Sequence, residues 1–497
     1  MVVGSFGAAV TSNALTRPTT TDYDHSVAAT EVPSGPLSPN INMCMTACIQ
    51  LEVAFLLAGK QIVSGIGGTS ILTSNYWAAQ QGAYVPACVI TPASAADVLA
   101  IVKQAETWQC QFSTKSGGHV PFAGASNIQG GILIDLSSVN EITLSSDKTS
   151  AVVGSGQRWA NVYAKLNALG LSALGTHTAD VGVGGSLLGG GISPLANQHG
   201  WGCDNVLSYE VVIGDQILTV TPTSYSDLYF ALRGGGNNFG IVTRFTIAVY
   251  PLELMWGGSY IYQMAEFAPV IDVMTNFTAQ SDSDPKGIAT TFLDYTAPVV
   301  NPPILANFTA PPHTASTMQV QTEASITTSI PSPWGFQQTF WTFTYKANNA
   351  LPHNIWVQCE QNVDAFLAQH PVAGFQLGCI FVPVIPTLIK NSNKNGGNAM
   401  GLTTDSALMM FLLQITWNNA ADQPYVYQFA QAFITEANAT AHSMGVNHPY
   451  VHLNYAHISQ NPFFGYGPTN LAKLRAVSKK YDPQQTFQKL QPGGFKL

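Results

Sequence analysis

The stretch Lys115-Ser-Gly-Gly-His-Val-Pro121 is the most informative part of this 497-residue chain. Gly117 and Gly118 have no Cβ, so their backbone can lie directly against a flat ligand. His119 follows at once and places an imidazole where it can bond to that ligand. The stretch therefore predicts a site in which a glycine pair and a histidine hold a planar group.

Two glycine-rich segments follow in order, Gly182-Val-Gly-Gly-Ser-Leu-Leu-Gly-Gly-Gly191 and Arg233-Gly-Gly-Gly-Asn-Asn-Phe-Gly-Ile-Val242. Near the C-terminus stand Leu453-Asn-Tyr-Ala456 and Tyr481-Asp-Pro483. These segments together resemble the berberine-bridge-enzyme-like family of FAD-linked oxidases. The resemblance spans about 84–497. It fits a fungal-type member, because Ala456-His457 stands where plant members commonly have Arg-Asp.

The resemblance implies an α+β fold of the vanillyl-alcohol oxidase superfamily. We expect a p-cresol-methylhydroxylase-type FAD-binding domain and an inserted substrate domain, in which helices flank an antiparallel sheet. The expected parts are a flexible leader (1–40), the FAD-binding domain (41–251, core 84–251), the substrate domain (252–448) and a C-terminal segment (449–497) that returns to the FAD domain.

His119 is the central residue that the resemblance assigns, because in this family the histidine after the glycine pair carries FAD covalently on the 8α-methyl of its ring. No cysteine lies between Cys110 and Cys203, so we expect one attachment point. The residues expected to bind the cofactor are Ser116, Gly117, Gly118, His119, Ala123, Gly124, Ser126, Gly182, Gly184, Gly185, Gly189, Asn237, Phe239, Gly240, Ile241, Val242, Asn454 and Tyr455.

Other ligand sites fit the sequence less well. The segment 182–191 looks like a dinucleotide fingerprint, but it lacks the strand–turn–helix setting and the acidic residue about 20 positions on that the fingerprint needs. Cys203 is expected to be a packed core thiol rather than a flavin ligand. No metal is expected, because His448, His452 and His457 lack helical spacing and carboxylate partners.

Tyr455 matches a tyrosine near the reactive face of the flavin in the family, and Tyr450 is a second candidate. A phenol assists proton transfer when its pKa is lowered or its substrate is easily deprotonated. The catalytic glutamate of the family's type enzyme has no match here. Glu323 and Asp294, on expected strands, are alternatives, so the identity of the base stays open.

Regular elements are expected along the whole chain. Expected helices are Asn42–Ala58, Ser94–Glu106 with Ser94 as N-cap, Trp159–Leu169 closed by Gly170, Asn354–His370, Pro424–Gly445 and Asn470–Lys480. Expected strands are 86–92, 111–114, 131–136, 151–154, 207–213, 217–221, 287–295, 319–328 and 451–455.

The composition excludes several protein classes. Only 9% of residues are charged and the net charge is -8, which argues against a disordered or nucleic-acid-binding chain. No apolar run approaches the ~18 residues that a membrane span needs. At this length two domains are expected.

The seven cysteines include no Cys-x-x-Cys pair. Cys44 and Cys48 would share one helix face, so each can reach one of Cys88 and Cys110, and Cys359–Cys379 would be a third bridge. Free thiols in a reducing compartment are the alternative. Sequons at 276, 307 and 438 favour secretion, whereas residues 1–35 show no signal-peptide pattern. We expect the secretory pathway, with an intracellular location as the alternative.

The function we expect is oxidation of a small, apolar or aromatic secondary metabolite by FAD. The substrate passes a hydride to flavin N5, and dioxygen reoxidises the flavin to give hydrogen peroxide. A monomer that binds only small molecules is expected. The alternatives are a carbohydrate oxidase and a cyclase that uses the flavin fold without net redox change.

Overall fold

The computed structural model describes residues 40–66, 75–280, 283, 286–289, 292–330, 332–402 and 406–497. All but the last residue of the expected leader lies outside this part. In the described chain two hydrophobic cores stand out. One collects buried side chains from 44–249, 382–410 and 450–495, and the other collects them from 256–441. No described helix has the length and apolar character needed to cross a membrane.

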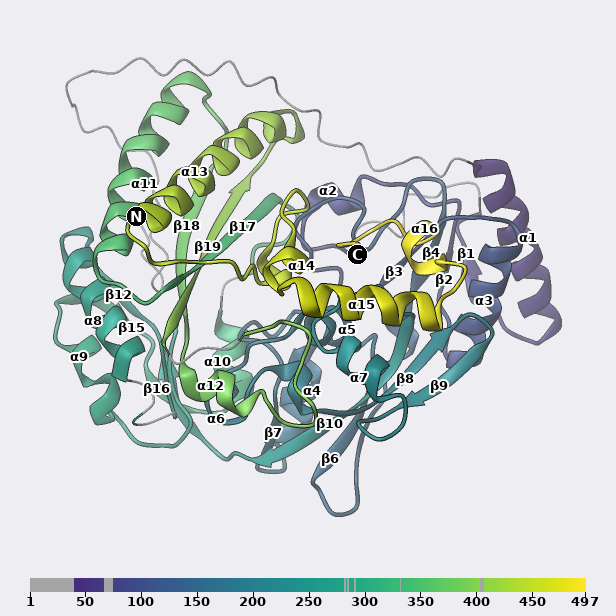
Figure 1. Cartoon of the computed structure of the whole chain (residues 1–497), viewed down its shortest axis with the longest axis horizontal. Coiled ribbons are helices and arrows are strands. Elements are labelled where there is room, and N and C mark those ends of the chain that lie inside the picture. Colours follow the sequence, from purple (N-terminus) through teal and green to yellow (C-terminus); the bar gives the residue numbers. More distant parts are fainter. Residues whose placement is uncertain are drawn as a thin grey trace.

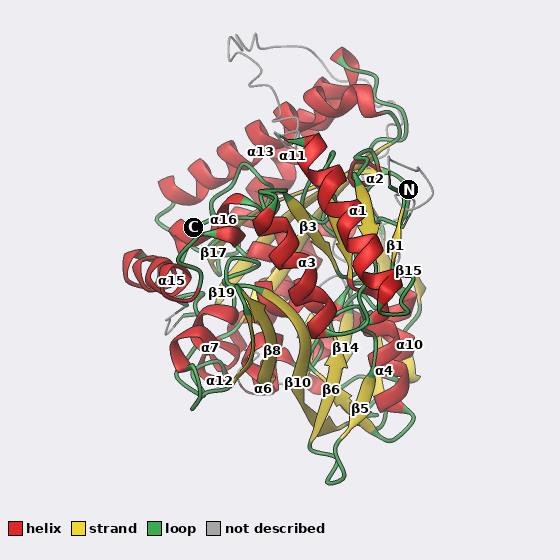
Figure 2. Cartoon of the chain, turned by 90° about the vertical axis from the view of Figure 1, so that its right-hand side faces the viewer, coloured by secondary structure: helices red, strands yellow, loops and turns green. Residues whose placement is uncertain are grey.

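The strand that leads into the glycine pair belongs to a small sheet. Its order is β1-β2-β4-β3, with β4 parallel to both β2 and β3 and with β1 antiparallel at the edge. Helices α1 and α3 lie side by side beside it (Figure 2). As expected, Ser94 caps α3 by accepting the N–H of Asp97 at 3.2 Å. The elements are α1 (Ile41–Leu57), β1 (Val63–Ser64), α2 (Ala79–Gly82), β2 (Cys88–Ile90), α3 (Ala95–Thr107), β3 (Phe112–Lys115) and β4 (Ile132–Asp135).

A second, antiparallel sheet continues the same body. Its order is β5-β6-β10-β8-β9, and β7 pairs with the end of β10. β10 begins within the third glycine segment, at Ile241. The elements are β5 (Ile142–Leu144), β6 (Ser150–Gly154), α4 (Trp159–Asn167), β7 (Leu171–Ala173), α5 (Val183–Gly189), α6 (Ala196–His199), η3 (Gly202–Asn205), β8 (Val206–Ile213), β9 (Gln216–Val220), α7 (Ser226–Leu232) and β10 (Ile241–Pro251).

The inserted segment forms the other body, drawn in teal and green in Figure 1. Its main sheet has the order β18-β19-β17-β20 and is antiparallel throughout. Helices α11 and α13 pack on one another, and α13 packs on β17, which confirms the expected helix-flanked sheet. The other strands form a four-stranded sheet, β13-β14-β11-β16, and the pair β12-β15.

The elements of the inserted segment run from residue 255 to residue 448. They are β11 (Met255–Gly258), β12 (Tyr260–Tyr262), α8 (Phe267–Gln280), β13 (Gly287–Ala289), β14 (Leu293–Tyr295), α9 (Ala306–Thr309), β15 (His313–Ser316), β16 (Gln319–Gln321), α10 (Glu323–Ser329), β17 (Gln337–Lys346), α11 (Ala350–Gln369), β18 (Gln376–Val384), α12 (Pro386–Asn391), β19 (Leu408–Trp417), α13 (Gln423–Ser443) and β20 (Asn447–His448).

The main inserted sheet joins the two cores. Along a strand, neighbouring side chains point to opposite faces. On β19, Phe411 belongs to the core under the helices, whereas Met410 belongs to the core of the first body. On β18 the same holds for Phe381 and Val382. One face of this sheet is therefore covered by helices and the other by the first body.

The last segment returns to the first body, drawn in yellow in Figure 1. The backbone N–H of Phe112 on β3 donates to Leu490 O at 2.7 Å, and the side-chain amide of Asn238 donates to Phe495 O at 2.9 Å. The elements are η8 (Leu453–Tyr455), α14 (Pro462–Gly465), α15 (Pro468–Tyr481) and α16 (Thr486–Lys489).

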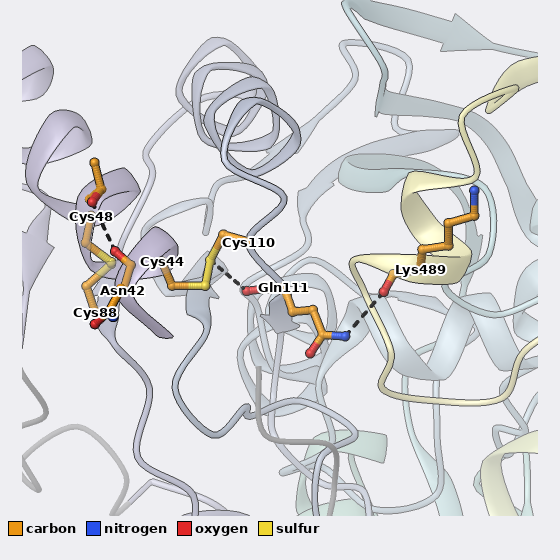
Figure 3. Close-up of a disulfide and its surroundings, with 8 residues drawn as sticks. Asn42, Cys44, Cys48, Cys88, Cys110, Gln111 and Lys489 are labelled. Atoms are coloured by element: carbon orange, nitrogen blue, oxygen red, sulfur yellow. Dashed lines mark hydrogen bonds between the residues drawn. A yellow bond between two sulfur atoms is a disulfide. The ribbon is translucent and has the colours of Figure 1, made fainter. Parts of the chain in front are cut away.

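Two disulfides fasten α1 to the first body, as expected (Figure 3). They join Cys44 to Cys110 and Cys48 to Cys88. The third expected bridge is absent. Cys359 on α11 and Cys379 on β18 are buried free thiols whose sulfur atoms lie 3.6 Å apart.

Two expected strands are wrong over most of their length. Residues 319–328 start as β16, but the hydroxyl of Thr322 accepts the N–H of Ser325 and caps helix α10. Residues 451–455 end in η8, where the N–H of Tyr455 donates to His452 O at 3.0 Å. In both cases a local turn or cap overrides the alternating pattern. The expected strand region 287–295 is confirmed, as the two antiparallel strands β13 and β14.

Candidate active site

A cavity of about 730 Å³ lies between the glycine segments and the inserted sheet. One wall comes from the first body and the C-terminal segment, and the other comes from the inserted segment. The expected cofactor residues that line it are Ser116, Gly117, Gly118, His119, Ser126, Gly182, Gly184, Gly185, Asn237, Gly240, Ile241, Val242, Asn454 and Tyr455.

The first two glycine segments meet backbone to backbone. A Cβ on Gly117 would collide with the backbone of Gly182, and a Cβ on Gly182 would collide with Gly117. In contrast, a Cβ on Gly185 would meet no atom within 4 Å. The glycines thus serve two purposes: some allow two loops to touch, and Gly185 leaves open space on the cavity wall.

Polar side chains beside these glycines hold the wall together. The hydroxyl of Ser116 donates to Ser155 O at 2.6 Å and accepts the N–H of Gly184 at 3.1 Å. The amide of Asn237 donates to Gly493 O at 2.9 Å, and the amide of Asn454 donates to Ser186 O at 3.0 Å. These hydrogen bonds hold the glycine loops in place on the cavity wall.

Five of the expected residues do not line the cavity. Ala123 and Gly124 lie behind it, where Gly493 packs on the carbonyl of Gly124. Gly189 lies against the side chain of Asn454, with which a Cβ at this position would collide. Phe239 is buried against Gly235. Tyr450 is 1% exposed, and its hydroxyl pairs with His452 Nδ1 at 2.9 Å.

His119 sits in an aromatic and acidic pocket. Its ring stacks on Trp77 with centroids 4.3 Å apart and planes 10° from parallel. Its Nε2 lies 3.3 Å from Asp180 Oδ1 and 3.2 Å from the hydroxyl of Ser332. A carboxylate at Nε2 favours the tautomer with the proton on that nitrogen, which leaves a lone pair on Nδ1.

Asp180 is held as a carboxylate. Burial alone raises the pKa of such a group, but hydrogen bonds from His119 and Ser332, and from Trp334 Nε1 at 2.6 Å, favour the charged form. The result is a pKa lowered to about 2. Arg158 lies over the Trp334 ring, 4.8 Å from its centroid, and adds a cation to this cluster.

Tyr455 lines the cavity where the C-terminal segment meets the inserted sheet. Its ring meets Phe340 of β17 edge to face at 6.4 Å and His452 at 4.7 Å. Burial raises its pKa to about 12. The phenol is therefore protonated at neutral pH, so it can donate a hydrogen bond but does not stand ready as a base.

The inserted sheet supplies the other wall, with polar and apolar positions on one face. Leu412, Gln414 and Thr416 alternate along β19, and they face the cavity together with residues of β18. From β18 come Gln376, Gly378, Ile380 and Val382. This wall suits a ligand that is mostly apolar and carries polar groups.

The alternative bases suggested by the sequence are elsewhere. Asp294 and Glu323 are fully buried and do not line the cavity. Glu323 accepts a hydrogen bond from Ser172, and burial raises the pKa of Glu323 to about 8 and that of Asp294 to about 7. Cys203 is buried in the first core, as expected of a structural thiol.

Sequence reasoning missed Trp77, His177 and Ser332 on the cavity wall. It also missed Asp180, which lies behind the wall against His119. Asp180 and His177 stand two and five residues before Gly182. A carboxylate and an imidazole just before a glycine segment were a usable signal. Trp77 and Ser332 come from distant parts of the chain, so nothing in the sequence links them to His119.

The cavity fits FAD. Its wall holds a long series of glycines, its volume suits a large ligand, and a histidine with a free Nδ1 faces it. A run of backbone N–H groups from glycine loops is the kind of concavity that binds a pyrophosphate.

Comparison with known proteins agrees. A family model described as an FAD binding domain matches residues 86–221. Over 518 residues the chain is 30% identical to an FAD-dependent monooxygenase of Cochliobolus heterostrophus, covering 96% of this chain and 99% of the relative.

Solved structures share the fold. 6-Hydroxy-D-nicotine oxidase of Arthrobacter nicotinovorans has a TM-score of 0.68 at 20% identity, covering 85% of this chain and 94% of that chain. Glucooligosaccharide oxidase of Acremonium strictum, described with a 6-S-cysteinyl, 8α-N1-histidyl FAD, has a TM-score of 0.63 at 19% identity, covering 90% and 97%.

Proposed function

Because this chain belongs to the berberine-bridge-enzyme-like family of FAD-linked oxidoreductases, we propose that it is an oxidase of a small apolar or aromatic metabolite, with FAD bound covalently through His119. The observation that carries the proposal is the position of His119, on the cavity wall beside the glycine cradle with Asp180 at Nε2.

The attachment is chemically balanced. A C–N bond between the imidazole and the 8α carbon replaces one N–H and one methyl C–H bond. The two protons and two electrons released reduce one dioxygen to hydrogen peroxide. Asp180 supports this step by holding the imidazole through Nε2.

When bound, FAD supplies the hydride acceptor, and dioxygen then takes two electrons and two protons to give peroxide. With FAD held by the glycine loops and His119, the substrate would lie between the cofactor and the inserted sheet. Tyr455 and Phe340 close one side of this space, and the apolar side chains of Ile380, Val382 and Leu412 on the sheet exclude water. The protonated phenol of Tyr455 donates a hydrogen bond to an oxygen of the substrate.

A monooxygenase is a second candidate, because the curated relative from Cochliobolus heterostrophus carries that name. A carbohydrate oxidase is less well supported. The related glucooligosaccharide oxidase has a cysteinyl as well as a histidyl flavin bond, whereas no described cysteine lines this cavity.

The experiment begins with purified protein and its His119→Ala variant, each precipitated with acid. We expect a yellow wild-type pellet and a colourless variant pellet. A colourless wild-type pellet overturns covalent attachment. A screen of phenols, benzylic alcohols and oligosaccharides then measures peroxide. One peroxide per substrate oxidised supports an oxidase, whereas label from ¹⁸O₂ in the product, with little peroxide, supports a monooxygenase.

We also propose that the protein passes through the secretory pathway. The two disulfides of α1 support an oxidising compartment. Glycosidase treatment of protein from a eukaryotic host tests this: a fall in mass is expected if the sequons are used, and cytosolic retention without glycans contradicts it.

A further inference from the structure

His177 is a cavity residue that the proposed reaction does not use. Both of its ring nitrogens are shielded from solvent, and neither has a hydrogen-bond partner among the described residues. His177 lines the cavity. A ring nitrogen that is shielded from water and has no partner is unfavourable, so such a side chain on a cavity wall points to a ligand atom.

The loop that carries His177 is held in place on both sides. The hydroxyl of Tyr163 donates to Thr176 O and accepts the N–H of Thr176, both at 2.8 Å. On the other side the N–H of Ala179 donates to Thr327 O of α10 at 3.2 Å. The backbone on both sides of His177 is therefore held in place where the first body meets the inserted segment.

The unpartnered ring of His177 offers a hydrogen bond to a ligand. Its neighbours Thr176 and Thr178 also line the cavity, and the hydroxyl of Thr176 donates to Thr178 O at 2.7 Å. Burial lowers the pKa of His177 to about 4, so the ring is neutral at pH 7 and offers one acceptor nitrogen.

We propose that His177 binds a hydroxyl group of the substrate, accepting its proton in a hydrogen bond, and so selects for phenols and other acidic alcohols. The inference rests on the proposed function, because it places the substrate in the same cavity as the flavin. It assigns Tyr455 and His177 complementary tasks: the first donates a hydrogen bond and the second accepts one.

The test compares two probes on the flavin-loaded protein in buffer at about pH 5.5, 4-nitrophenol and nitrobenzene, which differ by one hydroxyl that keeps its proton at this pH. Calorimetry gives the ratio of their dissociation constants. In the wild type we expect 4-nitrophenol to bind roughly tenfold more tightly, the value of about one hydrogen bond. His177→Ala should bring the ratio to about one, and His177→Gln, which keeps an acceptor, should restore part of it.

His199→Gln is the matched control. His199 is partly buried and also has a pKa lowered to about 4 by burial, but it stacks on Tyr250 and does not line the cavity. The ratio of the two dissociation constants measured for His199→Gln should equal that of the wild type. A wild-type ratio of one, or a His177→Ala ratio that stays near ten, overturns the inference.

Flavin content in the same samples separates the two proposals. A wild type without flavin refutes the proposed function, while the ratio still reports on His177. Loss of covalent flavin in the His177 variants with an unchanged ratio would mean that His177 serves the cofactor, which also overturns the inference. If His177→Ala does not fold, the comparison of wild type with His177→Gln decides.

Discussion

The Nε2 atom of His119 lies 3.3 Å from Oδ1 of Asp180, while Oδ2 of the same carboxylate receives the indole N–H of Trp334 at 2.6 Å. One carboxylate thus positions the imidazole and is itself positioned by the inserted segment. The residue that would hold the cofactor is therefore oriented by both bodies of the protein.

We first predict that Asp180→Asn slows covalent attachment of flavin. An amide cannot accept from both His119 and Trp334 as the carboxylate does, so the imidazole loses its fixed tautomer. Replacing the carboxylate that orients a functional histidine typically lowers activity by about 10–100-fold, and we expect a fall of this size in the attachment rate. The measurement is the time course of flavin that stays with acid-precipitated protein after FAD is added.

Asp147→Asn is the control for that experiment. Asp147 is an exposed carboxylate whose pKa is also lowered, by the hydroxyl of Ser145, and it lies away from the cavity. Equal rates for Asp180→Asn and the wild type would contradict the role assigned to Asp180.

A second prediction concerns Tyr455. With its pKa raised to about 12 by burial, the phenol stays protonated from pH 6 to pH 10. Replacing it by Phe should lower turnover by at least about tenfold on the substrate found by the screen. The wild-type pH profile should show no limb from this group below about pH 11. A variant with full activity would show that the hydroxyl is not used.

A third prediction is that the part of the stability contributed by Asp294 and Glu323 is lost as pH rises from about 4 to about 8. Asp294 and Glu323 have folded pKa values raised to about 7 and about 8 by burial, above their unfolded values. The folded state binds these protons more tightly, so stability is fully present below the unfolded pKa and is lost as pH rises through the folded pKa. Each group contributes up to about 1.4 kcal/mol per pH unit in that window.

Urea unfolding at pH 5 and pH 7 measures this dependence. Glu323→Gln should flatten it, because the amide does not ionise and can still pair with Ser172. Glu360→Gln, an exposed change on α11, should leave it unaltered. A Glu323→Gln variant whose stability changes between these two pH values by the same amount as that of the wild type would refute the prediction.

A fourth prediction is a thiol count. Cys203, Cys359 and Cys379 are free and buried. Ellman's reagent should therefore detect no thiol in the native protein and three after unfolding without reductant. A count of one would indicate that Cys359 and Cys379, whose sulfurs lie 3.6 Å apart, oxidise to the bridge that the sequence suggested.

The sequence predicted the parts of this protein that depend on local signals. Ser94 marks the start of α3 because a hydroxyl cap is a short-range contact, and α1 presents Cys44 and Cys48 on one face. The glycine segments were recognisable for the same reason. Each glycine is needed where two backbones meet or where the wall stays open.

What the sequence could not predict depends on contacts between distant segments. Tyr455 seemed to lie on a strand, but a turn from His452 forms η8. Glu323 seemed a candidate base, yet it is buried and accepts a hydrogen bond from Ser172, which is 151 residues away in the chain. The contact of His119 with Ser332 could not be predicted either, because the two residues are 213 positions apart and meet only where the inserted segment packs on the first body.

The cavity wall includes Gln491, Gly494 and Phe495, and β3 is bonded to Leu490. During synthesis these residues emerge from the ribosome after both bodies are already made. The binding pocket thus lacks one wall until then, and a nascent chain should not retain the coenzyme.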